Sequence, residues 1–154
     1  LVLESAKLVD KETFEEFSKR HNPSKGDIVF CRVGTYGTSA LVGEDTNFCL
    51  GQNTVFIIPN CNSEYLFAFL NSPFAQTQID SLISGTAQPT VSLKSLKSLD
   101  VPLPDEEKQK KTSDEINKIF RQVECLTKIY EEKLQNLTIL KSAVFTKELQ
   151  SEAP

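Results

Sequence analysis

Polar side chains that could bind a nucleic acid surround two glycines in the segment GDIVFCRVGTYGTSALVG. The segment predicts strands at 28–33 and 40–42, and Gly34 and Gly37 can take the positive φ angles of a tight reversal between them. An arginine can donate two hydrogen bonds to guanine, hydroxyls can bond phosphates or base edges, and a tyrosine ring can stack or bond a phosphate. The alternative is an ordinary hairpin tip whose arginine forms a surface ion pair. The candidate residues are Arg32, Thr35, Tyr36, Thr38 and Ser39.

A second polar segment, SGTAQPTVS at 84–92, is predicted to be an extended loop. It offers backbone amides together with Thr86 and Gln88, and a glutamine can form two hydrogen bonds with adenine. A structural loop that packs against the glycine reversal is the alternative. Gln52 and Asn53 lie between predicted strands, where a turn is the simpler interpretation.

No arrangement of residues indicates a catalytic, metal or cofactor site. His21 is the single histidine, and its place at a helix end before Asn22 and Pro23 predicts a solvated cap residue rather than a general base. The carboxylates are dispersed, and the glycine segment lacks the lysine and the spacing of a phosphate-binding loop. The four cysteines contain no CxxC pair, so buried free thiols at positions 31 and 49 are favoured over zinc ligands or a disulfide. An enzyme with an unfamiliar site is therefore the weakest functional hypothesis.

The composition is that of an ordinary globular domain, with 25% charged and 39% hydrophobic residues. The net charge is −4 and no basic block occurs, so a nucleic-acid reader with this balance would need its cations gathered on one face. No apolar run approaches the roughly 18 residues of a membrane span, and the scattered cysteines fit a reducing cytoplasm. The chain starts at Leu1 and contains no methionine, so we expect the sequence to be incomplete at its N-terminus.

Helix and strand signals in succession predict an α+β fold that positions the two polar segments. Ser72 and Pro73 start a helix that we expect to run to Gly85, because serine caps helices and proline suits the first turn. Residues 93–99 are predicted as a short turn or strand, and the prolines of DVPLP stiffen a linker at 100–104. The other predicted elements are helices at 10–20 and 64–72 and a strand at 54–58.

Residues 105–150 lack glycine and proline and repeat apolar residues in heptads, which predicts one long amphipathic helix of roughly 60 Å. A stripe of that length exceeds what the preceding ~100 residues could cover, so part of it should meet a partner helix. Lys133 interrupts one row, either to fix the register of the paired helices or because its long apolar stem packs on the stripe while its charge reaches solvent. The polar run KQKKTS predicts that the first two turns are solvated or fray. The rows consist of Ile116, Val123, Tyr130, Leu137 and Val144, and of Ile119, Leu126 and Leu140, with Phe120 and Leu134 beside them.

Three segments occur in a specific order: KGDIVFCRVGTYG, EYLFAFLNSPFAQ and SGTAQPTVSLKSLKSLDVPLPDEEKQK, followed by the heptad helix. Together they cover roughly residues 8–150 and resemble the specificity subunit of type I restriction–modification systems. The resemblance implies a small mixed α/β target-recognition domain at 1–104, shortened at its N-terminus. It also implies a conserved-region helix at 105–150 that forms a coiled coil.

The resemblance further implies a non-catalytic subunit that binds double-stranded DNA and reads one half of a split target. Such subunits hold two recognition domains apart with an antiparallel pair of long helices, which also dock the methyltransferase subunits; translocase-nuclease subunits complete the complex. The chemistry that uses S-adenosylmethionine or ATP belongs to those partners, so this chain would need no cofactor and would work in the cytoplasm, away from membranes. One recognition domain and one helix fit a homodimer or pairing with a second specificity half. A coiled-coil interaction module or remnant without independent DNA binding is the alternative.

Overall fold

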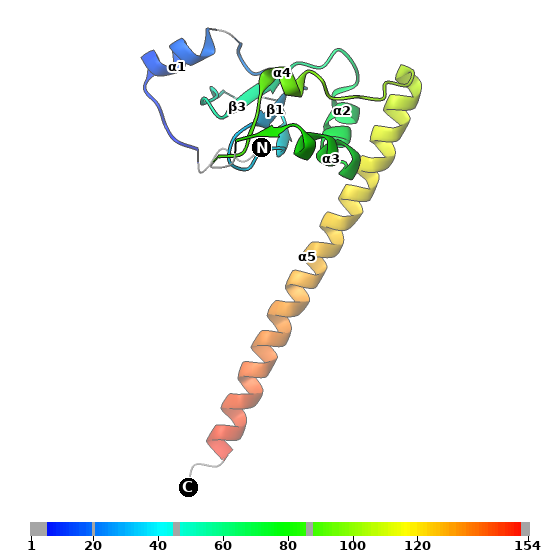
Figure 1. The fold of residues 1–154 in the computed structure, drawn as a ribbon. Helices are drawn as coiled ribbons and strands as arrows, with labels where there is room; N and C mark the ends of the chain where they lie inside the picture. Colours follow the sequence, from blue (N-terminus) through cyan, green and yellow to red (C-terminus); the bar gives the residue numbers. More distant parts are fainter. Residues whose placement is uncertain (1–5, 20, 45–46, 86–87, 152–154) are drawn as a thin grey trace. The chain divides into compact units, whose positions relative to one another are not determined.

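The computed structural model describes residues 6–19, 21–44, 47–85 and 88–151, with side chains up to Lys147. Its fold is of the α+β class, as predicted, with small antiparallel sheets, short helices and one long C-terminal helix (Figure 1). The chain divides into two compact units, Leu1–Ser113 and Asp114–Pro154. We call the first unit the head, and each unit is described by itself.

The head is built on a three-stranded antiparallel sheet in the order β2-β1-β3 (Figure 1). β1 (Ile28–Cys31) pairs with β2 (Ser39–Leu41) and with β3 (Thr54–Ile57). Ile28 and Phe30 are fully buried at alternate positions of β1, as a strand with one covered face requires. The three predicted strands are thus confirmed, although β1 ends two residues earlier than predicted.

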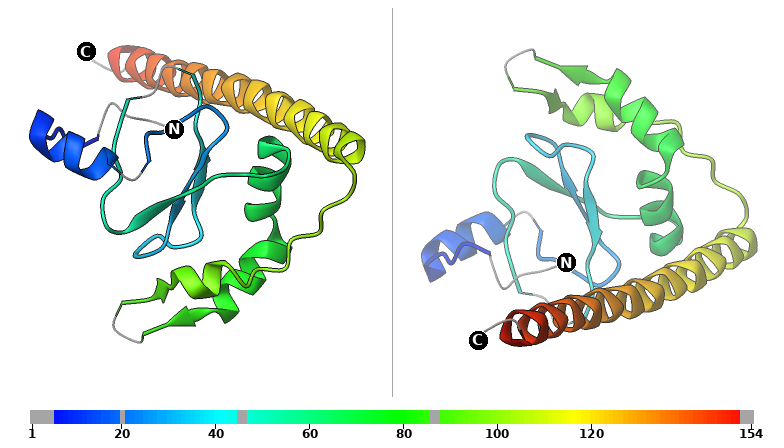
Figure 2. Two further views of the ribbon diagram at one scale, coloured as in Figure 1. Left: turned by 90° about the horizontal axis from the view of Figure 1, so that it is seen from above. Right: turned by 90° about the horizontal axis from the view of Figure 1, so that it is seen from below.

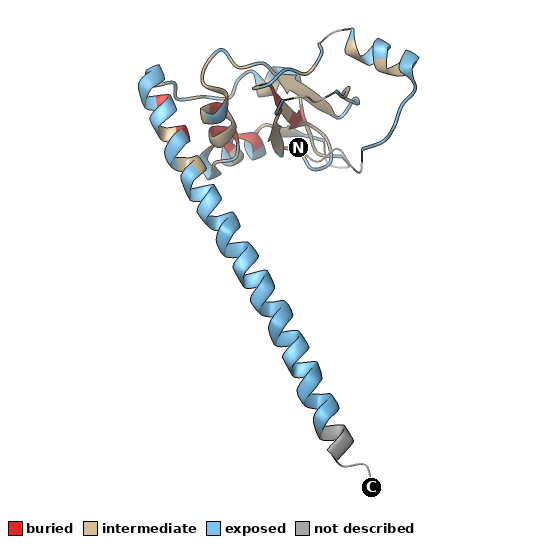
Figure 3. Cartoon of the chain, turned by 180° about the vertical axis from the view of Figure 1, so that it is seen from behind, coloured by how far each residue is buried: buried red, intermediate tan, exposed pale blue. Residues whose placement is uncertain are grey.

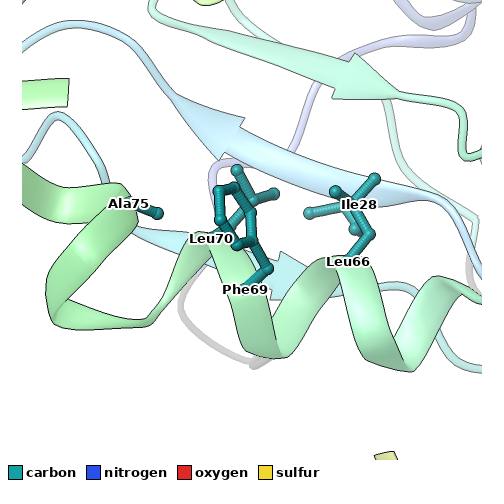
Figure 4. Packing of buried hydrophobic residues seen from close by; sticks show 5 residues of the cluster. All are labelled: Ile28, Leu66, Phe69, Leu70 and Ala75. Carbon is teal, nitrogen blue, oxygen red and sulfur yellow. The ribbon is translucent and has the colours of Figure 1, made fainter. Parts of the chain in front are cut away.

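α2 (Ser63–Leu70) packs against the sheet and is followed closely by α3 (Pro73–Ser81). Asn62 caps α2 and Ser72 caps α3, each through a side-chain oxygen that accepts a backbone N–H three residues on, at 2.8 and 3.2 Å. Both predicted helix starts are therefore confirmed. Figure 4 shows the apolar side chains that meet between these helices and β1, namely Ile28, Leu66, Phe69, Leu70 and Ala75.

The segment after α3 folds differently from the prediction. α3 ends at Ser81, and Ile83–Ser84 and Thr90–Val91 form the antiparallel strands β4 and β5, so the predicted helix to Gly85 and the predicted extended loop are both wrong. Leu93–Leu96 forms a short helix, α4, in place of the predicted turn or strand. Strands of two residues carry too little periodicity to be recognised in a sequence. Figure 2 shows the β4–β5 hairpin and α4 side by side.

This hairpin completes the second part of the core. Phe30 of β1, Ile79 of α3 and Val91 of β5 are fully buried in one cluster, which we call the second core cluster. The three residues come from distant parts of the chain, so their burial ties the hairpin to the sheet and to α3. Such burial stabilises a fold by about 25 cal/mol for each Å² of apolar surface removed from water.

α1 (Lys11–Ser18) begins after Asp10, as predicted, and lies apart from α2 and α3 (Figure 2). The Asp10 carboxylate accepts a first-turn N–H at 2.7 Å, and this hydrogen bond lowers the pKa of the carboxyl. The prediction of a solvated His21 is wrong, because its Nε2 lies 2.6 Å from Oδ2 of Asp27, whose side chain is only 6% exposed. The imidazole also packs edge-on against the ring of Phe56. Asp27 and Phe56 thus cover much of the histidine, whose side chain stays 27% exposed.

α5 (Glu106–Ser151) runs unbroken through the predicted heptads. Its first two turns contradict the expected fraying, because Gln109 is 5% and Ser113 1% exposed, and both residues belong to the head. Figure 3 shows buried segments in these turns and mostly exposed surface along the described side chains of the second unit. The prediction of solvated or frayed turns was wrong because Gln109 is held by hydrogen bonds, which the polarity of the sequence does not reveal.

Candidate nucleic-acid interface

Three turns of the head lie at the carboxyl end of β1. β2 and β3 run antiparallel to β1, and β5 joins the extension of β1 through an antiparallel bridge between Val33 and Thr90. Each of these strands starts where β1 ends, so the turn that precedes it lies there too. The structure therefore brings together the two polar segments singled out in the sequence and adds a third. The turns are 34–37, 51–53 and the described part of 85–89.

Arg32 connects these turns. Its backbone N–H donates to the carbonyl of Asn53 at 2.8 Å, and its own carbonyl accepts the N–H of Val91 at 3.0 Å. The guanidinium donates to the carbonyl oxygens of Gln52 at 3.2 Å and of Val91 at 3.5 Å. Its Nε–H is buried and has no hydrogen-bond partner in the described part of the chain. The guanidinium thus uses some of its N–H groups inside the head, so fewer of them remain to hydrogen-bond a DNA base than the sequence alone suggested.

The 34–37 turn and the residue after it present two threonine side chains to solvent. Both of its glycines have φ +80°, as predicted for a reversal that requires positive φ. Thr35 and Thr38 are exposed, and the hydroxyl of Thr38 donates to the carbonyl of Thr35 at 2.7 Å. Tyr36, between them, is half-buried and packs against the second core cluster, so part of its ring is covered.

Two side chains anchor the 34–37 hairpin, one on α3 and one at the C-terminal cap of α2, and sequence reasoning missed both. Gln76 donates to the carbonyl oxygens of Gly37 at 3.1 Å and of Leu70 at 2.7 Å. A β-carbon at Gly37 would lie 2.7 Å from Oε1 of Gln76, so a larger residue there would displace this side chain and disturb its hydrogen bonds, besides the strain of the positive φ. Asn71 donates to the hydroxyl of Ser39 at 2.8 Å, so that candidate already has a partner. Isolated polar residues such as these two carry no periodic signal that could have identified them.

The β4–β5 turn carries the remaining candidates. The side chain of Gln88 is exposed, and the backbone carbonyl of this residue accepts a hydrogen bond from the hydroxyl of Thr90 at 3.0 Å. Thr86 lies outside the described residues. Because Thr90 also pairs with Val33, the turn is held beside the 34–37 reversal, which is the packing that the alternative interpretation expected.

The second unit carries an exposed apolar surface, which we call the apolar face. Its residues are 52–67% exposed, an extent that marks interaction sites when the patch is contiguous. Nζ of Lys133 lies 5.7 Å from the ring centre of Tyr130. The lysine that interrupts the heptad row therefore places its ammonium group over the ring of a tyrosine on the same face. Ile116, at the start of the rows, is half-buried. The apolar face consists of Ile119, Phe120, Val123, Leu126, Tyr130, Leu134, Leu137, Leu140 and Val144.

Other kinds of site find little support in the described ranges. Among those residues, no group of histidine, cysteine and carboxylate side chains could hold a metal ion. All four cysteines are free, and Cys31 and Cys49 are half-buried rather than fully buried. Burial raises the pKa of the Cys61 thiol, which lowers its reactivity as a nucleophile. No helix in the described part of the chain has the length and apolar character to cross a bilayer.

Proteins of known type match the sequence over most of its length. A family model described as the type I restriction modification DNA specificity domain matches residues 4–136, from the head into α5. The type I restriction enzyme EcoBI specificity subunit of Escherichia coli is 28% identical to this chain over 137 residues. That alignment covers 87% of this chain and 29% of the relative, so the chain spans less than a third of the relative's length.

Proposed function

Because the chain belongs to the family of type I restriction modification DNA specificity domains, we propose that its head is a target-recognition domain that reads one half of a bipartite sequence in double-stranded DNA. The observation that carries this proposal is the gathering of the 34–37, 51–53 and 85–89 turns at one end of β1. Turns mounted on a packed sheet can vary their side chains without disturbing the core, which suits a domain that must read different sequences.

The candidate residues divide by what they can offer to DNA. Hydroxyls can contact phosphates or base edges, and a glutamine amide can pair with adenine, so the exposed side chains are the proposed direct contacts. They are Thr35, Thr38 and Gln88. The half-buried candidates have partners inside the head and can use only the groups that remain, and these are Arg32, Tyr36 and Ser39. The hydroxyls of Thr35 and Thr38 also donate hydrogen bonds within the head, so they are proposed to accept from the DNA. Thr86 remains a candidate on sequence grounds.

We assign the apolar face of α5 to pairing with a second long helix, from another copy of the chain or from a second specificity half. A helix pair that buried ~1,500 Å² would form an interface of ordinary size. In this assignment the paired helices run antiparallel and dock the methyltransferase subunit, and a translocase-nuclease subunit joins the complex. Catalysis and its cofactors would reside in those partners, and this chain would be a non-catalytic reader in the cytoplasm, where its free thiols stay reduced.

A gel shift tests the proposal, with the full chain bound to the methyltransferase subunit from the same genome and at a stated salt concentration. We expect a selected sequence to bind at least about 10³-fold more tightly than random DNA. Replacing both Thr35 and Thr38 with alanine should reduce that ratio by about tenfold or more, because two hydrogen bonds to the target are lost. Thr138→Ala, an exposed threonine on α5, is the matched control and should leave the ratio unchanged. Equal affinity for every sequence would refute the proposal.

A protein-interaction module without independent DNA binding is the second candidate function. The net charge of −4 disfavours binding to a polyanion, and the apolar face requires only a protein partner. Sedimentation at tens of micromolar separates this candidate from the first when it is combined with the gel shift. A stable assembly that shows no sequence preference on DNA would favour the interaction module.

A further inference from the structure

The linker that leads into α5 is bound to α2 and α3 along its backbone. Gln78 of α3 exchanges two hydrogen bonds with Asp100: its Nε2 donates to the carbonyl at 3.1 Å, and its Oε1 accepts the backbone N–H at 2.9 Å. The hydroxyl of Tyr65 on α2 donates to the carbonyl of Pro102 at 2.8 Å. Three hydrogen bonds therefore fix the main chain of a segment whose sequence indicated only a stiff linker.

Gln109 attaches the first turn of α5 in the same way. Its Oε1 accepts the backbone N–H of Asn62 at 3.0 Å, and its Nε2 donates to the carbonyl of Pro104 at 2.7 Å. Both ends of the amide are thus used, and the residue is 5% exposed. The flanking Lys108 and Lys110 are exposed, so Gln109 is the residue of this turn that faces the head. Because hydrogen bonds are directional, this attachment defines an orientation as well as a contact.

We infer that Gln109 is a positioning residue, which fixes the first turns of α5 on the head and thereby sets the separation at which two paired chains read the halves of their target. The inference rests on the proposed function. α5 is continuous from Glu106 to Ser151, so a change in the direction of its first turns is carried to the helix that pairs. Base pairs are spaced about 3.4 Å apart, so a single separation of half-sites requires that each head holds its helix in one defined way.

Selection from a pool of randomised duplex DNA tests the inference, with the full chain bound to the methyltransferase subunit. We expect the wild type to select two half-sites at a single separation. Gln109→Ala should select the same half-sites at neighbouring separations as well, with discrimination between adjacent separations reduced by about tenfold. Tyr65→Phe, which removes one hydrogen bond of the linker and keeps the ring, should broaden the separation to a smaller degree.

Gln122→Ala, at an exposed glutamine on the same helix, is the matched control and should keep one separation. Thermal melting of each variant identifies a general loss of stability, and if Gln109→Ala does not fold, Tyr65→Phe decides the question. Weaker binding with an unchanged single separation would overturn the inference, because it would show a purely structural role. A wild type that selects a single half-site would also overturn it, since no separation would exist to be set. A wild type that selects no sequence would instead defeat the proposed function itself.

Discussion

The guanidinium of Arg32 lies against main-chain carbonyls of Gln52 and Val91, which belong to two different segments. A charged donor strengthens such hydrogen bonds, and its partial burial makes their loss costly. An arginine that reads guanine has to project its two terminal nitrogens from the surface. The contacts therefore favour a role for Arg32 in holding the turns in place, whereas Thr35 and Thr38 are exposed and their hydroxyl oxygens can still accept hydrogen bonds.

Arg32→Lys separates the two roles at the scale of one residue. Lysine keeps the charge, but its single ammonium group cannot donate to both carbonyls as the planar guanidinium does. We therefore expect the free energy of unfolding to fall by about 1–2 kcal/mol. If Arg32 holds the turns, affinity should fall equally for all sequences and the selected sequence should not change. Loss of preference at one base position would instead identify Arg32 as a base reader. Arg121→Lys, at an exposed arginine on α5, is the control for the change of side chain.

At the scale of elements, α5 is a helix whose stability depends on what it meets. Its local features are favourable, because it contains neither glycine nor proline and Glu106 and Glu107 lie in its first turn. In the second unit, however, most of the described apolar side chains are exposed, so burial contributes little to that part of the helix until a partner is present.

Two aspartate substitutions test the apolar face. Leu137 and Ile139 are 61% and 59% exposed, but only Leu137 belongs to the heptad rows. We expect Leu137→Asp to weaken self-association by at least about 100-fold, because a carboxylate would be buried in the helix pair. Ile139→Asp should change the association several-fold at most. Sedimentation velocity over a range of concentrations measures both, and equal effects of the two variants would show that the heptad rows are not the interface.

At the scale of the whole molecule, the balance of charge limits how the protein can bind DNA. A net charge of −4 means that the chain as a whole is repelled by a polyanion, so the proposed affinity for DNA would have to come from local contacts at the turns. The proposed methyltransferase partner would supply cations that this chain lacks. The salt dependence of binding therefore reports how the phosphate contacts are shared between the two.

Binding to the selected DNA should show a shallow salt dependence for the chain alone and a steeper one for the complex. We expect a slope of log K against log salt of about −3 or shallower without the partner, because few lysines and arginines would neutralise phosphates. The measurement is a titration at four or more salt concentrations with and without the methyltransferase subunit. A slope of the chain alone as steep as that of the complex would contradict this division of contacts.

The sequence by itself determined the features that depend on neighbours in the chain. Gly34 and Gly37 predicted the hairpin through their φ angles, Ser72 predicted a helix start through its cap, and the heptads predicted α5 through their period. The order of three segments also carried the resemblance to specificity subunits, which the family match confirms.

Only the tertiary structure decided how these parts meet. The hydrogen bonds of Gln76 to Gly37, of Arg32 to Gln52 and of Gln109 to Asn62 each join residues 20 or more positions apart, and the two-residue strands β4 and β5 exist because they pair. Single polar side chains have no period, and their partners are set by the packing of the helices on the sheet. For that reason the sequence placed the candidate residues on two turns, but only the fold brought the turns to one end of β1.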